Sequence, residues 1–118
     1  MSRNKRVLVI EDEFEVGLDI QHSLSNAGFD VLGPCTTLEA AFGAAEAGEF
    51  DAAVVDANLN GQNSGSVAEV LIRKHIPFMV ISGYAREFLP LAAANAPLLG
   101  KPFDTARLVT MVRKLCFG

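Results

Sequence analysis

The sequence predicts an α/β domain in which a five-stranded parallel sheet carries helices on both of its faces. Three observations predict this fold. Half of the 118 residues are hydrophobic and 20% are charged, so a single domain spanning 1–118 can bury a core of its own. Short apolar runs without alternation recur along the chain, as in strands that are buried on both faces. Helical patterns separate these runs, and this alternation is typical of parallel strands joined by right-handed crossovers.

The predicted strands are the apolar runs. They cover residues 7–10, 31–32, 52–55, 78–81 and 98–99. A unit of this length with five strands fits the flavodoxin-like order 2-1-3-4-5, counted along the chain. In that order, ligands bind beyond the carboxyl ends of the strands, where the strand order reverses. We therefore expect the functional crevice just past the first and the third strand.

Helical stripes lie between these runs. Apolar residues recur at spacings of three and four within 16–27, 38–45 and 108–115. The segment 85–96 is rich in alanine, but Pro90 removes an amide donor and disfavours an uninterrupted helix. We expect this segment to be short or mobile.

Capping residues predict where the helices begin. Thr36 with Glu39, and Ser66 with Glu69, have the spacing of a capping box. Asp104 is placed to cap the last helix. The local signals and the apolar pattern therefore agree on the same helices.

The charge balance argues against an anionic partner. Ten Lys and Arg stand against fourteen Asp and Glu, a net charge of −4, which is the wrong sign for nucleic acid or an anionic membrane. Between Val7 and Ile72 there are twelve acidic residues and no Lys or Arg. This split fits either a basic partner surface or solvated acidic helix faces, and both remain open. No apolar run is long enough to span a bilayer and no signal peptide is evident, so we expect a cytoplasmic protein.

Cysteine and histidine do not form a site in this pattern. Cys35 and Cys116 are too few for a disulfide framework, so we expect two reduced, structural thiols. His22 and His75 are far apart in sequence and have no neighbouring ligands, which favours surface positions.

Carboxylates follow two of the predicted strands. Glu11, Asp12 and Glu13 come directly after the first strand, and Asp56 comes directly after the third. Two unit charges about 4 Å apart repel by about 4 kcal/mol at an effective dielectric constant of about 20, so such a cluster implies a divalent cation. Hard oxygen ligands with room for water suit Mg²⁺, which is often held together with a phosphate oxygen.

The other strand ends carry groups that bind phosphate. The fourth strand ends in Ser82 and Gly83, and the fifth ends in Gly100 and Lys101. Parallel strands bring a hydroxyl donor and a cation to the same edge of the sheet. Each can hold an oxygen of a phosphoryl group.

Taken together, these residues resemble a response-regulator receiver (CheY-like) domain over essentially the whole chain. The resemblance rests on Glu11-Asp12, Asp56, Ser82 and Lys101-Pro102-Phe103, in this order and at these strand ends. It implies a stand-alone response regulator of a two-component phosphorelay. The partner that it implies is a sensor histidine kinase or a histidine phosphotransfer protein, and a phosphorylation-dependent dimer is left open.

The resemblance also implies a role for each site residue. Asp56 accepts a phosphoryl group from a phosphohistidine, and Ser82 and Lys101 contact the phosphoryl oxygens. The ligands of Mg²⁺ that it implies are Glu11, Asp12, Asp56 and the backbone carbonyl of Asn58. A cis peptide bond is implied between Lys101 and Pro102. Such a domain is a signalling phosphoprotein, which only phosphorylates and dephosphorylates itself. On phosphorylation it switches the surface formed by its fourth strand, fourth helix and fifth strand.

Two features depart from the commonest receiver pattern. Leu98 stands three residues before the lysine, where an aromatic residue usually rotates on activation. The stretch 77–84, PFMVISGY, is similar to the signature of the variant receivers called FATGUY, with Ser82 in place of Thr. This similarity implies kinases of the HWE or a related class. Our hypothesis is that Tyr84 borders the phosphoryl group and takes over part of the switch.

Three alternatives remain from the residues alone. The stretch from Asp56 to Gly61 imitates the opening of an EF-hand loop, but Val67 stands where the bidentate Glu is needed. A phosphatase of the haloacid-dehalogenase type needs a second Asp two residues after the nucleophile, where this chain has Asn58. The third alternative is an interaction module without a working site.

Overall fold

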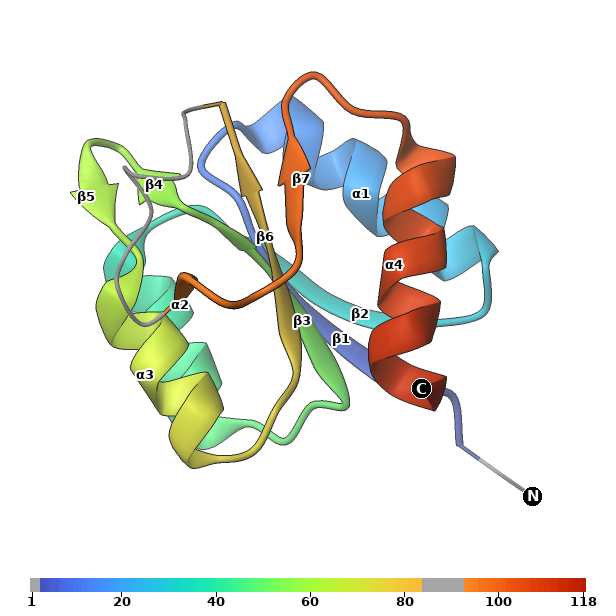
Figure 1. The fold of residues 1–118 in the computed structure, drawn as a ribbon, viewed down its shortest axis with the longest axis horizontal. Helices are drawn as coiled ribbons and strands as arrows, with labels where there is room; N and C mark the ends of the chain where they lie inside the picture. Colours follow the sequence, from blue (N-terminus) through green and yellow to red (C-terminus); the bar gives the residue numbers. More distant parts are fainter. Residues whose placement is uncertain (1–2, 84–92) are drawn as a thin grey trace.

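The computed structural model of the protein describes residues 3–83 and 93–118. A sheet of five parallel strands runs through the centre of the molecule (Figure 1). Its strands are β1 (Arg6–Ile10), β2 (Asp30–Cys35), β3 (Ala52–Asp56), β6 (Phe78–Ser82) and β7 (Leu98–Gly100). Their spatial order is β2-β1-β3-β6-β7, which is the flavodoxin-like order 2-1-3-4-5 when these strands are counted along the chain. The predicted fold class is therefore confirmed.

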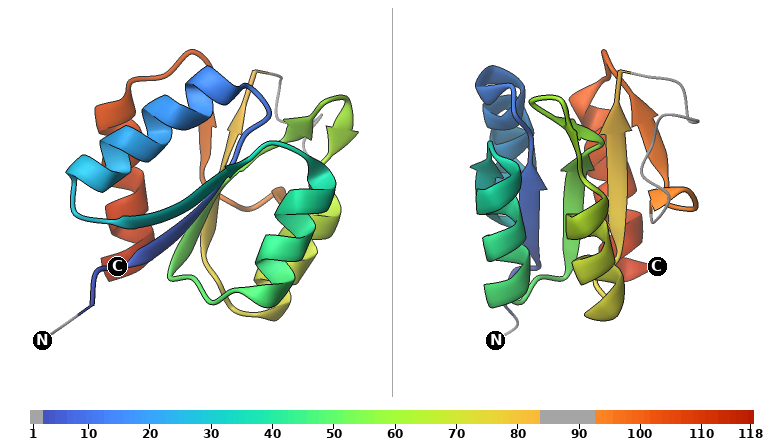
Figure 2. Two further views of the ribbon diagram at one scale, coloured as in Figure 1. Left: turned by 180° about the vertical axis from the view of Figure 1, so that it is seen from behind. Right: turned by 90° about the vertical axis from the view of Figure 1, so that its left-hand side faces the viewer.

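Helices cover both faces of the sheet. In the described residues these are α1 (Phe14–Asn26), α2 (Leu38–Ala47), α3 (Gly65–Arg73) and α4 (Thr105–Phe117). The pair α1 and α4 packs on one face, and the pair α2 and α3 packs on the other (Figure 2). Most of the segment 85–96, with Pro90, and also Tyr84 lie outside the described residues, so the predictions on them remain predictions.

The core consists of two apolar layers, one on each face of the sheet. In β1, Leu8 and Ile10 pack with α2 and α3, whereas Val7 and Val9 pack with α1 and α4. All four side chains are fully buried. This burial on both faces explains why the strand is a continuous apolar run in the sequence. Each such side chain contributes about 1.5–3 kcal/mol to folding by leaving water.

Two helix starts were predicted at the correct place or within one residue of it. The hydroxyl of Thr37 accepts a hydrogen bond from the amide of Ala40 at 3.1 Å, so Thr37 caps α2 and the capping box at Thr36 was wrong by one residue. Thr36 and Thr37 are adjacent and carry the same hydroxyl, so the sequence spacing alone does not show which of them caps the helix. Asp104 caps α4 as predicted, accepting from the amide of Ala106 at 2.9 Å.

The predicted start of α3 was wrong. This helix begins at Gly65, before the capping box expected at Ser66 and Glu69, and its N-cap is Ser64. The amide of Ser64 donates to the carbonyl of Ala57 at 3.2 Å, and its hydroxyl donates to the same carbonyl at 3.4 Å. These bonds tie the helix to the end of β3 and set its start earlier than the local sequence indicates.

A small antiparallel ribbon follows β3, and the sequence analysis did not predict it. It consists of β4 (Asn58–Leu59) and β5 (Gln62–Asn63). The two residues of its turn are Asn60, with φ 54°, and Gly61, with φ 85°. Asn-Gly with positive φ at both positions is typical of a two-residue hairpin turn, because asparagine and glycine tolerate the left-handed region.

Close packing fixes the position of α1 against β2. A Cβ atom at Gly17 would lie 2.6 Å from Cβ of Pro34 and 3.7 Å from Cβ of Glu11, so only glycine fits at this crossing. The Gly33–Pro34 peptide bond is cis, and so is the Lys101–Pro102 bond, as the resemblance implied.

The remaining predictions on single residue types are simple to compare with the structure. His22 and His75 are exposed. Cys35 and Cys116 are free and half-buried. Among the helices of the described ranges, none combines the length and the apolar character that a membrane crossing requires.

Candidate functional site

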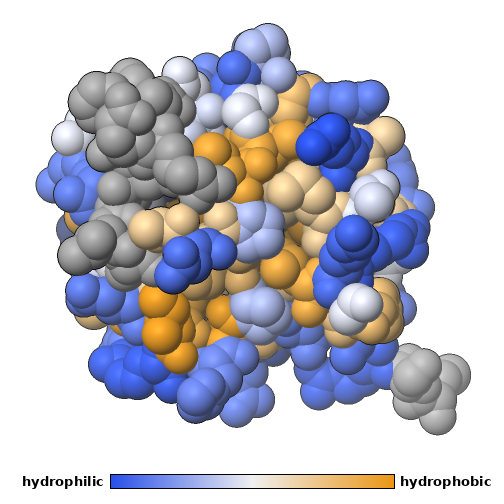
Figure 3. All heavy atoms as spheres, in the orientation of Figure 1, coloured by the Kyte–Doolittle hydropathy of each residue, from blue (hydrophilic) through white to orange (hydrophobic). Residues whose placement is uncertain are grey.

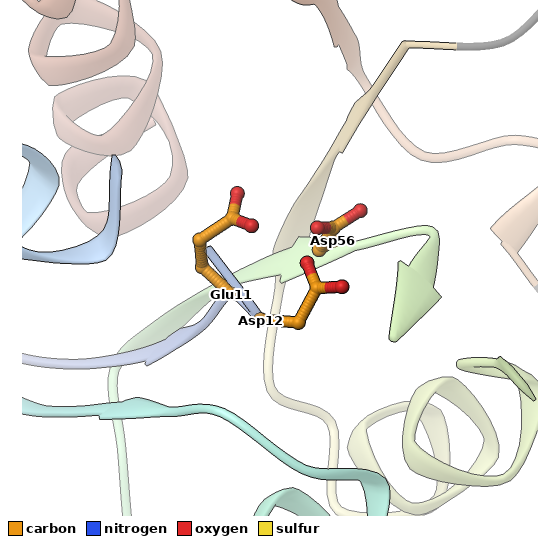
Figure 4. A group of neighbouring side chains, drawn as sticks. All are labelled: Glu11, Asp12 and Asp56. Carbon is orange, nitrogen blue, oxygen red and sulfur yellow. The ribbon is translucent and has the colours of Figure 1, made fainter. Parts of the chain in front are cut away.

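Three carboxylates meet at the carboxyl ends of β1 and β3. These strands are neighbours, and Ile10 is paired with Val55, so the residues that follow β1 lie next to the end of β3. Glu11 and Asp12 follow β1, and Asp56 ends β3 (Figure 4). One carboxylate oxygen from each residue lies within 4.8 Å of the other two. The structure thus brings together the acidic residues that the sequence analysis selected.

Lys101 joins this cluster from the end of β7. Its ammonium nitrogen lies 3.0 Å from Oε1 of Glu11 and 3.2 Å from Oδ2 of Asp56. It also lies 3.0 Å from Oε1 of Glu13. The backbone amide of Lys101 donates to the carbonyl of Ser82 at 2.9 Å, which ties the lysine to the end of β6. One ammonium group therefore contacts three carboxylates from two chain segments.

Glu11 is held in a fixed position. Its side chain is fully buried, and Oε2 accepts hydrogen bonds from the amide of Glu13 at 3.0 Å and from the Lys101 ammonium at 3.2 Å. Oε1 has no hydrogen bond of good geometry, although it lies within ion-pair distance of the ammonium. A buried carboxylate costs several kcal/mol unless it is paired, so the ion pair with Lys101 stabilises Glu11 at this buried position.

The cluster carries more negative than positive charge. Burial, followed by the adjacent Glu11 carboxylate, raises the pKa of Asp56 to about 8. Burial alone would also raise the pKa of Asp12, but hydrogen bonds from the Asn60 amide and from the neighbouring carboxyl groups outweigh it and lower that pKa. For Lys101, burial lowers the pKa, but hydrogen bonds to Glu11 and Glu13 outweigh it and raise the pKa above its ordinary value.

The donor set fits a magnesium ion. The carboxylate oxygens of Glu11, Asp12 and Asp56 are the hard ligands that Mg²⁺ prefers, and a divalent charge would offset burial and the neighbouring Glu11 carboxylate, which raise the pKa of Asp56. The side-chain oxygen of Asn58 already accepts from the amide of Gly61 at 2.7 Å. This bond is compatible with the backbone carbonyl of Asn58 as the ligand, which the resemblance implied.

A cavity of about 330 Å³ opens next to the carboxylates. It is lined by Asp12, Glu13, Asp56, Asn58, Gly83 and Lys101. Since a water molecule occupies about 30 Å³ in the liquid, this space can hold a hydrated ion together with a phosphoryl group. The site thus combines negative ligands, a cation and open volume at one edge of the sheet.

Ser82 lies at the same edge of the sheet as Asp56. Asp56 is paired with Ile81 of β6, and Ser82 is the next residue along that strand, where it is buried. Ser82 is also paired with Gly100, which directly precedes Lys101. The strand pairing therefore places the backbone positions of the hydroxyl residue, the lysine and the aspartate on adjacent strands.

Two contributors to the site were not predicted. Glu13 was recognised as part of the acidic run, but its ion pair with Lys101 was not foreseen. The amide of Asn60 donates to Oδ2 of Asp12 at 3.0 Å and so orients that carboxylate. The Asn60-Gly61 dipeptide is a hairpin signal, and it could have shown that the chain turns back toward the site at this point.

The same ribbon argues against an EF-hand loop. The segment that imitates such a loop follows a strand, and the side chain of Asn60 donates to the carbonyl of Thr36 at 3.3 Å. Val67, at the position of the bidentate ligand, is buried in α3. The segment therefore forms a strand end and a hairpin, not the helix-flanked loop of an EF-hand, and Val67 offers no ligand oxygen.

Comparisons with known proteins agree with this arrangement. No family model matches the sequence, and no curated protein matches it. Among solved structures, the receiver domain of the sensor histidine kinase PA1611 from Pseudomonas aeruginosa PAO1, with a magnesium ion coordinated in its active-site cleft, is 21% identical. It superposes with a TM-score of 0.83, covering 98% of this chain and 99% of that one.

Two further structures are similar to the chain. The non-phosphorylated receiver domain of HemR from Leptospira biflexa is 22% identical, with a TM-score of 0.82 over 98% of this chain and 96% of that one. A response regulator from Burkholderia pseudomallei, with a phosphorylated aspartic acid, a calcium ion and citrate, is 22% identical, with a TM-score of 0.76 over 94% of this chain and 72% of that one. From the strand order and these superpositions, the chain has the fold of response-regulator receiver domains.

Proposed function

We propose that this chain is a phosphoryl acceptor of a two-component phosphorelay, in which Asp56 receives a phosphoryl group from a phosphohistidine. The observation that carries the proposal is the buried carboxylate of Asp56, which lies between an acidic pair and the Lys101 ammonium beside an open cavity. The similar response regulator from Burkholderia pseudomallei, which holds a phosphorylated aspartic acid, supports it. The donor is a sensor histidine kinase or a histidine phosphotransfer protein.

The chemistry needs no general base once Asp56 is ionised, because its carboxylate is then the nucleophile, and a divalent cation at the cluster would favour that ionised form. An oxygen of Asp56 attacks the phosphorus in line, and a new P–O bond forms while the P–N bond to the histidine breaks. The electron pair of the broken bond returns to the imidazole nitrogen, which takes up a proton from water. Lys101 and Ser82 donate hydrogen bonds to phosphoryl oxygens, and Lys101 also offsets their negative charge.

The residues that would hold Mg²⁺ are Glu11, Asp12, Asp56 and the carbonyl of Asn58. When bound, the ion supplies a positive charge that offsets the charge of the phosphoryl oxygens and of the carboxylates. The chain supplies the orientation: the Asn60 amide holds Asp12, and the amide of Asn58 donates to Oδ1 of Asp56 at 3.1 Å. These two bonds come from the ribbon that follows β3.

The output of such a module is a change of surface. Phosphorylation adds up to about two negative charges at Asp56, which draws Ser82 inward and shifts β6 and the chain that follows it. The edge strand β7 lies next to β6, and hydrophobic residues gather around β7 and α4 on the face shown in Figure 3. Leu98 is half-buried on β7, in place of the usual aromatic residue. The FATGUY-like stretch supports a kinase of the HWE or a related class.

Labelling with a small phosphoryl donor tests the proposal. With Mg²⁺ and acetyl phosphate, we expect the protein to gain the mass of one phosphoryl group, with acetate as the leaving group, and to lose it again on standing. Asp56→Asn should gain none. Asp51→Asn, at the other end of β3, is the matched control and should be labelled like the parent.

Other outcomes would contradict the proposal. An interaction module without a working site gains no phosphoryl group in any variant. A phosphatase releases phosphate continuously instead of accumulating one labelled group. Labelling that persists in Asp56→Asn would place the acceptor elsewhere.

A further inference from the structure

The Lys101 ammonium is fully engaged in the unphosphorylated protein. An ammonium group has three N–H donors, and the nitrogen lies within 3.2 Å of oxygens from Glu11, Glu13 and Asp56. A phosphoryl oxygen that binds Lys101 must therefore replace one of these partners or share its hydrogen atom. The structure indicates which partner gives way.

The three partners differ in how easily they can leave. The side chain of Glu11 is fully buried, and it also accepts the amide of Glu13, so releasing it would strand a carboxylate without water. Asp56 is the residue that carries the phosphoryl group, so it stays at the site. The side chain of Glu13 is 62% exposed, and water can replace the ammonium at little cost.

The side chain of Glu13 has no competing structural role at the start of α1. Glu13 is the N-cap of this helix, yet its side chain makes no capping hydrogen bond. Serine, threonine, aspartate and asparagine are the usual N-caps, because their oxygens reach the helix amides. A glutamate here fits a residue whose side chain serves Lys101 instead.

The Glu13–Lys101 ion pair also lies between two cavities. Both residues line the 330 Å³ cavity at the site and a second cavity of about 370 Å³ between α1 and the start of α4. The second cavity is walled by Val16, Pro102 and Phe103 among others. A released Glu13 carboxylate therefore has open space to move into.

We propose that Glu13 is a positioning residue that holds one N–H of Lys101 in competition with the phosphoryl group on Asp56. This inference rests on the proposed function. In the resting state Glu13 keeps the ammonium at the rim of the cavity. On phosphorylation it gives up that contact to a phosphoryl oxygen and turns into water. Glu13 thereby weakens the binding of the phosphoryl group, and its removal should strengthen it.

The test measures the affinity for beryllofluoride, a phosphoryl analogue, in the presence of Mg²⁺. We expect Glu13→Gln to bind it about two- to fivefold more tightly than the parent, the range that a half-exposed ion pair contributes. Glu15→Gln is the matched control, because Glu15 is an exposed acid in the first turn of the same helix and loses the same charge. Its affinity should equal that of the parent.

Measurements at different salt and metal concentrations distinguish direct competition for Lys101 from a long-range effect of the removed charge. At 1 M salt the Debye length is about 3 Å, so charge effects between separated, exposed groups are almost fully screened, whereas an exposed ion pair at 3.0 Å is weakened only in part. The gain in Glu13→Gln should therefore shrink at high salt but not disappear. The Mg²⁺ affinity of both variants is measured as well, and the beryllofluoride affinities are compared at saturating Mg²⁺, so that a change in metal binding is not mistaken for competition at Lys101. A structure with beryllofluoride should place Oε1 of Glu13 more than 4 Å from the Lys101 nitrogen.

Distinct results would overturn the two proposals. Equal beryllofluoride affinity in Glu13→Gln and Glu15→Gln, or weaker binding in Glu13→Gln, removes the role of Glu13 but leaves the phosphoryl acceptor in place. A parent protein that binds no beryllofluoride and is not labelled at Asp56 removes both. If Glu13 only favoured the helix dipole, both variants would lose equal stability without any change in affinity.

Discussion

An aspartate lies at each end of β3, and the two carboxylates have opposite surroundings: one accepts a backbone hydrogen bond, and the other lies among like charges. Asp51 precedes the strand and is half-buried; its Oδ2 accepts the amide of Arg6 at 2.8 Å, and its own amide donates to the carbonyl of Arg6 at 2.8 Å. Asp56 ends the strand, is 3% exposed and lies among like charges. The residue type and the strand are the same, and only the neighbouring strand ends differ.

This difference shows where the fold tolerates electrostatic strain. At the amino end of β3, the chain supplies a hydrogen-bond donor from β1, and the carboxylate of Asp51 stabilises the sheet edge. At the carboxyl end, β1 supplies two more acids, and one lysine from β7 does not balance them. Unrelieved repulsion in an otherwise well-paired structure is typical of a binding site, because the missing charge comes from a ligand.

The largest expected effect is the loss of metal binding at the carboxyl end. Asp12→Asn keeps an oxygen that can accept from the Asn60 amide but removes one negative ligand, so we expect Mg²⁺ affinity to fall at least about tenfold. Titration calorimetry measures this, with Asp51→Asn as the control. An unchanged Mg²⁺ affinity in Asp12→Asn would contradict the view that only the carboxyl end of β3 binds a cation.

The next effect is on stability and its pH dependence. Asp56 has a pKa of about 8 in the folded protein and an ordinary aspartate pKa near 4 when unfolded. Between these values the folded state binds more protons, so without Mg²⁺ the parent should lose stability as the pH rises through this window. Asp56→Asn stays neutral and should be more stable than the parent by about 2 kcal/mol or more at pH 8, with no difference below pH 4.

Urea unfolding followed by circular dichroism at several pH values checks this prediction. Added Mg²⁺ should stabilise the parent and reduce its slope with pH. A parent that becomes more stable between pH 5 and pH 8 without metal would show that Lys101 already balances the cluster.

The smallest effect is expected at the amino end. Asp51→Ala removes the acceptor of the Arg6 amide, so the free energy of unfolding should fall by about 1 kcal/mol, the usual contribution of one hydrogen bond. The same unfolding experiment measures it. Substitution should thus lower the free energy of unfolding at Asp51 and raise it at Asp56. A stabilising substitution at Asp51 would contradict this difference between the two ends of β3.

The sequence indicated the sheet and the acidic cluster well, for a physical reason. The central strands β1, β3 and β6 are buried on both faces and are continuous apolar runs, whereas the edge strands β2 and β7 are only partly buried and have shorter apolar stretches. The residue after each run lies at the carboxyl edge of the sheet. Asp12, Asp56 and Lys101 could be placed together on this basis alone. The order of the strands was predicted because a five-strand unit of this length fits the flavodoxin-like order.

Features that depend on contacts distant in sequence were not accessible in the same way. The ion pair of Glu13 joins it to Lys101, 88 residues away, and nothing local shows which acid of the run faces the lysine. The start of α3 is set by bonds from Ser64 to the end of β3. The strands β4 and β5 have two residues each, too few for any periodicity, although the Asn-Gly turn between them was a usable signal.

The crossing of Gly17 and Pro34 has a consequence for how such a module can diversify. A methyl group at position 17 would clash with Pro34 at 2.6 Å, whereas its distance of 3.7 Å from the first carbon of the Glu11 side chain is an ordinary contact. Relief of the clash must move α1 or β2, and α1 begins directly after the acidic residues. The chemistry at the sheet edge can therefore be retuned by a change in an uncharged backbone crossing, with every ionisable group left as it is.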